Sequence, residues 1–134
     1  MATLRDEVVK IRASEDIVRV RQLVREWSIA QKFSLVEQTK MITAASELAR
    51  NTLEHGGGGE VRLEALNDGA KLGLRLTFTD AGPGIADIEQ ALKDGYSTGT
   101  GMGLGLSGSK RLVNDFKIQS HPGKGTTVII ARWR

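Results

Sequence analysis

The sequence contains no cysteine, two histidines, two prolines, two tryptophans, one tyrosine and three phenylalanines. Without cysteine the chain can form neither a disulfide framework nor a thiolate metal or redox site. Because His55 and His121 are the only imidazoles, a zinc site is disfavoured, and any metal would bind to oxygen ligands. The few aromatic side chains, and the absence of a dense Lys/Arg run, argue against nucleic-acid binding.

Long apolar runs are also missing. No segment approaches the ~20 apolar residues that a membrane span needs. Arg5, Asp6 and Glu7 stand where a signal peptide would have its apolar core. We therefore expect a cytoplasmic protein that does not interact with a membrane.

The 134 residues are 40% hydrophobic and 26% charged, as in an ordinary globular domain, and we expect one domain over residues 1–134. The net charge of +3 is unevenly spread: residues 95–134 contain six basic residues and one acidic residue. This C-terminal excess is either a solvated basic face or a surface that attracts phosphates or an acidic partner.

The first 55 residues contain no glycine and have helical patterns. After a short strand at residues 7–12, Ser14 is the expected N-cap of a first helix. Ser34 and Glu37 form a capping box for a second helix, which Gly56 should end. Apolar residues recur at helical spacing in both helices, at Ile17, Val20, Leu23, Val24 and Trp27 and at Met41, Ile42, Ala45, Leu48, Ala49 and Leu53.

The second half has strand patterns. Residues 61–65 and 72–78 alternate in polarity around an Asn67-Asp-Gly69 turn, which predicts a hairpin. We expect a short helical piece at 85–92, a loop at 93–103, a helix at 104–115, and strands at 116–120 and 126–133 joined by a turn at 121–125. This order predicts an α+β two-layer sandwich, with helices on one face of a mixed, mostly antiparallel sheet.

Asp80 has the same phase as the apolar side chains of its predicted strand, so its carboxylate should point toward the covered face. A buried carboxylate needs a donor or a metal, and Gly82 and Gly84 would let a ligand approach the backbone. The alternative is an ordinary acidic residue that opens a turn. The functional interpretation is an acceptor for an exocyclic amine, such as that of adenine.

Glu47 and Asn51 lie four residues apart, and therefore on one face of the second helix. Asparagine is unfavourable within a helix, which suggests an oxygen that is used for a ligand such as Mg²⁺. Taken alone, the pair is equally typical of a solvated helix face.

Residues 99–106 alternate glycine with Thr, Met and Leu and lead into a helix. Such a loop presents backbone N–H groups to a phosphate, and the helix N-terminus adds its dipole. A flexible linker is the alternative. A dinucleotide-binding motif is rejected because no hydrophobic strand precedes the loop, and no G-x-x-x-x-G-K-[ST] motif is present.

These three elements together resemble the GHKL (Bergerat-fold) ATPase and kinase superfamily. Residues 47–51 resemble its N box, residues 80–84 its G1 box and residues 99–106 its G2 box, while Thr126-Thr127 resembles its last motif. The resemblance covers essentially the whole chain, and four weak motifs in the right order are strong together. It implies a Bergerat-type sandwich that binds ATP and Mg²⁺.

Within that superfamily the chain lacks a phosphoacceptor helix and is most similar to the stand-alone RsbT-type switch kinases, with the RsbW- and SpoIIAB-type anti-sigma kinases as relatives. The similarity lies in residues 42–51 and 94–98, in the Gly-Leu-Gly-Leu stretch and in Lys110-Arg-Leu112. It implies a serine/threonine kinase that phosphorylates a STAS-domain protein (RsbS/RsbR-like) in a stressosome. After partner switching, the kinase would activate an effector such as a PP2C-type phosphatase.

Carried over to this sequence, the resemblance implies that Glu47 is the general base, Asn51 a Mg²⁺ ligand and Asp80 the adenine anchor, with Thr127 supporting Asp80 or its water. The remaining residues implied to bind the nucleotide are Gly82, Gly84, Ile85, Ser97, Thr98, Gly99, Gly101, Gly103, Leu104 and Gly105.

Two alternatives remain open: an anti-sigma factor kinase that holds a sigma subunit, and a nucleotide-gated binding module without significant transfer activity. The glycine-rich stretch His55–Gly59 is unusual after the N box, and His55 is explained as a cation at a helix C-terminus.

Overall fold

The computed structural model describes residues 1–85, 92 and 103–134. Its elements follow the chain in the order β1 (Ala2–Ile11), α1 (Ser14–Ala30), α2 (Leu35–Glu54), β2 (Gly59–Asn67), β3 (Leu72–Asp80), α4 (Gly103–Leu112), β4 (Asp115–Ser120) and β5 (Thr126–Trp133). None of the described helices is long and apolar enough to cross a membrane.

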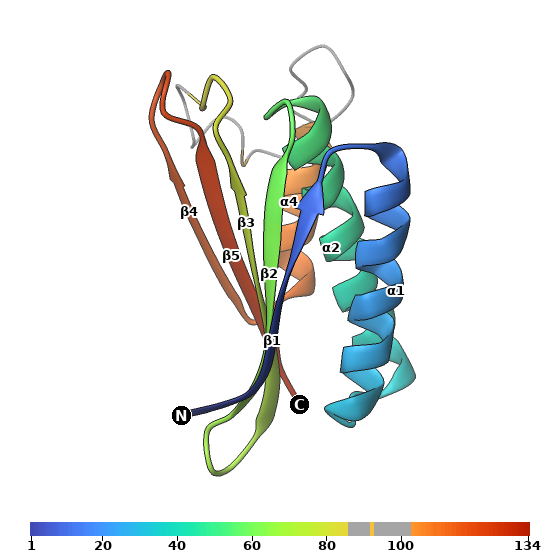
Figure 1. Cartoon of the computed structure of the whole chain (residues 1–134). Coiled ribbons are helices and arrows are strands. Elements are labelled where there is room, and N and C mark those ends of the chain that lie inside the picture. Colours follow the sequence, from blue (N-terminus) through green and yellow to red (C-terminus); the bar gives the residue numbers. More distant parts are fainter. Residues whose placement is uncertain (86–91, 93–102) are drawn as a thin grey trace.

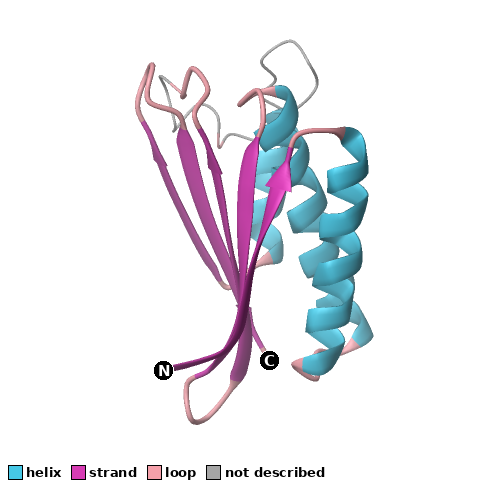
Figure 2. Cartoon of the chain, viewed as in Figure 1, coloured by secondary structure: helices cyan, strands magenta, loops and turns pink. Residues whose placement is uncertain are grey.

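The described strands form one sheet in the order β1-β2-β3-β5-β4, and all four pairings are antiparallel. The three described helices lie on one face of this sheet (Figures 1 and 2). The predicted α+β sandwich is confirmed. The sheet is antiparallel throughout the described pairings, so the expected parallel component of a mixed sheet is absent there.

The core lies between the two layers. Its largest fully buried side chains come from both helices and sheet: Ile11, Val20, Val24, Trp27, Met41, Leu48, Leu63, Leu74, Leu76, Phe78 and Ile130. The apolar stripes predicted for the first two helices thus face the sheet, and burial of a side chain of this size stabilises the fold by roughly 1.5–3 kcal/mol.

The predicted boundaries hold at most elements and are wrong at three. β1 begins at Ala2, five residues before the predicted start, and pairs with β2 across a bulge between Thr3 and Arg5. Ala13 rather than Ser14 is the N-cap of α1, and Asp16 accepts hydrogen bonds from the backbone N–H groups of residues 12 and 13.

The third wrong boundary is the end of α4. This helix ends at Leu112 rather than 115, because the Arg132 guanidinium donates to the Leu112 carbonyl at 2.8 Å and Asn114 N–H donates to Ala131. The predicted helical piece at 85–92 lies almost entirely outside the described residues.

The capping box of α2 is confirmed. Ser34 Oγ accepts from Glu37 N–H at 3.1 Å, and the Glu37 carboxylate accepts from Ser34 N–H at 3.0 Å. The Ser34 backbone N–H holds the pKa of Glu37 below its usual value. This cap fixes where α2 begins, and its 20 residues then carry Glu47 and Asn51 to the other end of the molecule.

Candidate nucleotide site

The predicted site residues meet at one end of the sandwich. β3 ends there at Asp80, α2 ends there at Glu54, and the turn between β4 and β5 lies beside them (Figure 1). The antiparallel register pairs Gly59 with Asp80 and Asp80 with Thr126, so β2 and β5 begin where β3 ends. The fold therefore brings together segments that are about 70 residues apart in the chain.

Asp80 follows the alternation of its strand, in which Leu74, Leu76 and Phe78 are buried. Its side chain is half-buried, and Oδ1 accepts a hydrogen bond from Gly82 N–H at 2.9 Å. This bond is the turn chemistry that was the alternative interpretation of Asp80. Oδ2 has no hydrogen bond among the described residues.

The loop after Asp80 is docked on the β4–β5 turn. Gly123 N–H donates to the Pro83 carbonyl at 2.7 Å. Gly84 has a φ of +77°, and a Cβ on it would overlap the carbonyl oxygen of His121. Glycine is therefore required at position 84 both for its backbone conformation and for the close approach of the turn.

Ser120, the last residue of β4, fixes the same loop through a hydrogen bond to Ile85. Its buried hydroxyl accepts from Ile85 N–H at 2.7 Å and lies 3.1 Å from the Gly125 carbonyl and 2.8 Å from Thr126 Oγ1. Sequence reasoning missed Ser120, because its partners lie 5, 6 and 35 residues away and no local pattern marks them.

The structure places Thr126, rather than Thr127, beside Asp80. Thr126 is the cross-strand partner of Asp80 and shares the covered face with Val128, whereas Thr127 is opposite Thr79, which is exposed. The strand register therefore makes Thr126 the direct neighbour of Asp80, and the support of Asp80 or its water by Thr127 stays a prediction. The period of two in residues 126, 128 and 130 is the sequence pattern that identifies Thr126.

Glu47 and Asn51 lie on one face of α2 at the rim of the core, each half-buried, next to the buried Leu48 and Thr52. Among the described residues Glu47 makes one long ion pair, 3.5 Å to Arg50, and this pair is too exposed to hold the carboxylate firmly. Asn51 Oδ1 is buried and has no hydrogen-bond partner in the described structure. A buried amide oxygen without a partner is costly unless a ligand supplies one.

This orphaned oxygen fits a Mg²⁺ ligand. No group of three or more His, Asp or Glu side chains that could hold a metal occurs among the described residues. Mg²⁺ is commonly bound through one or two protein oxygens, with waters and substrate phosphates completing its shell. Asn51 alone would therefore suffice as the protein ligand in the described part of the site.

The predicted phosphate loop lies mostly outside the described residues: Ser97, Thr98, Gly99 and Gly101 are not described. Gly103, Leu104 and Gly105 form the first turn of α4, which packs against α2. The loop thus leads directly into a helix N-terminus next to the helix that carries Asn51, which is the arrangement suited to a phosphate.

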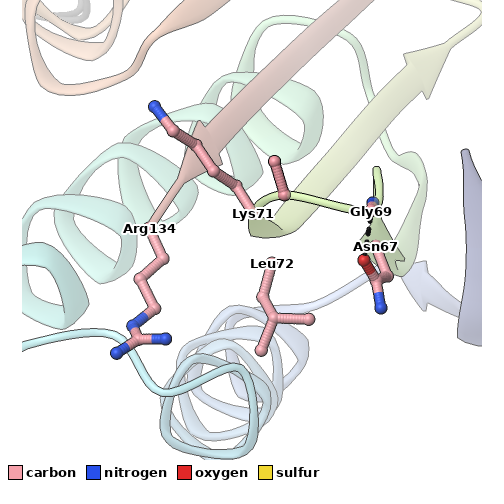
Figure 3. Close-up of a pocket in the computed structure, with 6 residues that line it drawn as sticks. Asn67, Gly69, Lys71, Leu72 and Arg134 are labelled. Atoms are coloured by element: carbon pink, nitrogen blue, oxygen red, sulfur yellow. Dashed lines mark hydrogen bonds between the residues drawn. The ribbon is translucent and has the colours of Figure 1, made fainter.

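A separate hollow of about 580 Å³ lies at the opposite end, near the β2–β3 turn and the C-terminus (Figure 3). Its lining includes the cationic side chains of Lys71 and Arg134 together with Leu72. It contains none of the predicted site residues.

Comparison with known proteins agrees with this geometry. Residues 36–134 match the family described as histidine kinase-, DNA gyrase B- and HSP90-like ATPases. The chain is 42% identical over 125 residues to the serine/threonine-protein kinase RsbT of Bacillus subtilis, covering 93% of this chain and 94% of that protein. It is 31% identical over 103 residues to an anti-sigma F factor of Halalkalibacterium halodurans, covering 72% and 69% of the two chains.

Two solved structures share the fold. The crystal structure of the RsbU and RsbW domains of Rv1364c from Mycobacterium tuberculosis superposes with a TM-score of 0.67 and 21% identity, covering 97% of this chain and 33% of that longer one. The mycobacterial sensor histidine kinase MprB gives a TM-score of 0.58 and 19% identity, covering 96% and 97%. The chain therefore belongs to the histidine kinase-, DNA gyrase B- and HSP90-like ATPase (GHKL) family and is an enzyme of its serine/threonine kinase branch.

Proposed function

We propose that this protein transfers the γ-phosphate of ATP to a serine or threonine of a small STAS-domain protein and changes partners as a result. The observation that carries the proposal is that three groups meet at one end of the sandwich: Asp80 Oδ2 and Asn51 Oδ1, which have no hydrogen-bond partner among the described residues, and the partly buried Glu47. The similarity to RsbT over nearly the full length of both chains supports the same activity.

Each residue has a distinct role in this proposal. Asp80 Oδ2 accepts a hydrogen bond from the adenine amine, and Gly82 and Gly84 line the base; their missing side chains let this loop pack closely on Gly56 and on His121. Thr126 and Ser120 hold the strand end and the following loop in place. The first turn of α4 and the preceding loop receive the phosphates.

Asn51 would hold Mg²⁺, which when bound neutralises phosphate charge. Glu47 lies one helical turn before Asn51 on the same face, and in this proposal it accepts the proton of the acceptor hydroxyl. Most of the rate enhancement in such a site comes from positioning and charge neutralisation.

The acceptor protein would dock across α2 and the loop at 93–103, where its hydroxyl reaches Glu47. Lys124, in the β4–β5 turn beside the site, favours an acidic surface on that partner, whereas Arg132 and Arg134 lie at the opposite end of the sandwich. We further propose that the released protein activates an effector such as a PP2C-type phosphatase in a cytoplasmic stressosome module.

The experiment is incubation with γ-labelled Mg·ATP and each STAS-domain protein encoded nearby. Transfer of label to one of them supports the proposal. Transfer of label together with nucleotide-dependent binding of a sigma subunit would favour the anti-sigma factor kinase alternative, for which the similarity to the anti-sigma F factor is the supporting observation. Nucleotide binding without transfer to any partner would favour a nucleotide-gated binding module.

A further inference from the structure

The glycine run at residues 56–59 has no role in the function proposed above, although it joins α2 to β2 at the candidate site. Gly56 is buried and follows α2 after one residue. Its N–H donates to the Asn51 carbonyl at 3.0 Å, so its position is fixed relative to the residue proposed to hold the metal.

The Asp80 side chain occupies the space that a side chain on Gly56 would need. A Cβ built on Gly56 would overlap Asp80 Cγ and lie 2.5 Å from Asp80 Cβ and 2.6 Å from Oδ2, closer than Cβ atoms come to other atoms in proteins. Asp80 cannot yield easily, because its side chain is short and its backbone is paired with Gly59 and Thr126 on both sides. Gly56 is not among the positive-φ glycines, so contact rather than backbone conformation excludes alanine.

A second close contact joins the Gly56 backbone to Gly82 in the loop after Asp80. A Cβ on Gly82 would lie 2.7 Å from Gly56 Cα and 2.8 Å from the Gly56 carbonyl oxygen. Gly82 also donates its N–H to Asp80 Oδ1. The Asp80 carboxylate is therefore held on one side by the Gly82 N–H and on the other by the bare backbone of Gly56.

We propose that Gly56 is a positioning residue. It holds the Asp80 carboxylate in place and fixes the distance between that carboxylate and Asn51 on α2. The inference rests on the proposed function, in which Asp80 accepts a hydrogen bond from adenine. A side chain at position 56 would displace the carboxylate away from α2, so that the base and the phosphates could no longer be bound at the same time.

The first test is calorimetric titration of Mg·ATP into wild type, Gly56→Ala and Gly57→Ala. Gly57 is the matched control, since it is exposed, has a φ of +74° and has no atom within 4 Å of a built Cβ. Gly57→Ala therefore shows how much backbone strain in this glycine run changes ATP affinity when no contact with Asp80 is made. We expect Gly56→Ala to lower ATP affinity roughly tenfold or more, and Gly57→Ala to change it by less than about threefold.

The second test compares the thermal melting of Gly56→Ala, Asp80→Gly and the double variant. Asp80→Gly removes the three atoms that lie nearest to a Cβ on Gly56. If the contact is as described, Gly56→Ala lowers Tm in the wild-type background and has little further effect in the Asp80→Gly background. This readout remains decisive even when Gly56→Ala alone does not fold, because the double variant should then recover the fold.

Wild-type ATP affinity in Gly56→Ala, equal losses in Gly56→Ala and Gly57→Ala, or an undiminished Tm loss in the Asp80→Gly background would each overturn the inference. Wild-type protein that binds no ATP would refute the proposed function instead, and the melting comparison would still decide whether Gly56 seats Asp80.

Discussion

Removal of the Ser120 hydroxyl is expected to loosen the loop after Asp80. That hydroxyl accepts from Ile85 N–H at 2.7 Å and is 2.8 Å from Thr126 Oγ1. Ser120→Ala leaves the Ile85 N–H and the Thr126 hydroxyl without this hydrogen-bond partner. An unsatisfied buried polar group lowers the free energy of unfolding by about 1–3 kcal/mol. Because Ile85 is only half-buried and regains some solvation, we expect a total loss of about 2–3 kcal/mol.

For a domain of this size the loss corresponds to a fall in Tm of about 8–12 °C. ATP affinity should fall as well, by about threefold to tenfold, because the loop that borders the base is no longer anchored. Differential scanning fluorimetry and calorimetric titration measure the two effects.

Ser28→Ala is the matched control, since the Ser28 hydroxyl is buried in α1 and has no hydrogen-bond partner in the described structure. We expect its Tm to stay within about 2 °C of wild type. Ser120→Thr, which keeps the hydroxyl, should recover ATP affinity. Equal Tm losses in Ser120→Ala and Ser28→Ala, or unchanged ATP affinity in Ser120→Ala, would refute the assigned role of the Ser120 hydrogen bonds.

Three further changes test the site and the fold. Asp80→Asn keeps the size of the side chain but puts an N–H donor where the adenine amine needs an acceptor. Calorimetry should show at least a tenfold loss of ATP affinity, and unchanged affinity would contradict the assignment of Asp80 to adenine. Asn51→Ala should weaken ATP binding in excess Mg²⁺ but not in a chelator, and an equal loss in both would contradict metal ligation. The lowered pKa of Glu37 means that its stabilising effect is present above the ordinary pKa of 4.5 and is lost as pH falls through the lowered value. Glu37→Gln, which retains the capping box, should therefore show a smaller fall in Tm than wild type between about pH 5 and pH 3; parallel curves would contradict this.

The fold was predictable wherever one local pattern governed the structure. Ser34 and Glu37 identified the start of α2, and alternation identified β2 and β3. β1 was predicted too short because residues 2–6 have no apolar alternation and are held by pairing with β2. The Asp16 cap of α1 was missed because Ser14 is a preferred N-cap residue, whereas the actual N-cap, Ala13, has no side chain that could mark the position.

The site was predictable to the level of the segments that form it. Glu47, Asn51 and Asp80 follow from helical spacing and strand phase together with the family resemblance. The position of Thr126 opposite Asp80 was not predicted, because it depends on the register between β3 and β5, which no local pattern gives. The contact between Gly56 and Asp80 joins two segments only after folding, so the glycine run had no explanation in the sequence.

The central claim is phosphoryl transfer to a hydroxyl on a second protein, and the most direct test is mass spectrometry of the STAS-domain partner after incubation with Mg·ATP and either wild type or Glu47→Ala. We predict acid-stable phosphoserine or phosphothreonine on the partner. With Glu47→Ala, the rate should fall by roughly 10²-fold or more while ATP still binds, because the base acts on the acceptor. Phosphohistidine on this chain, no phosphorylated hydroxyl on any partner, or a wild-type rate with Glu47→Ala would contradict the account.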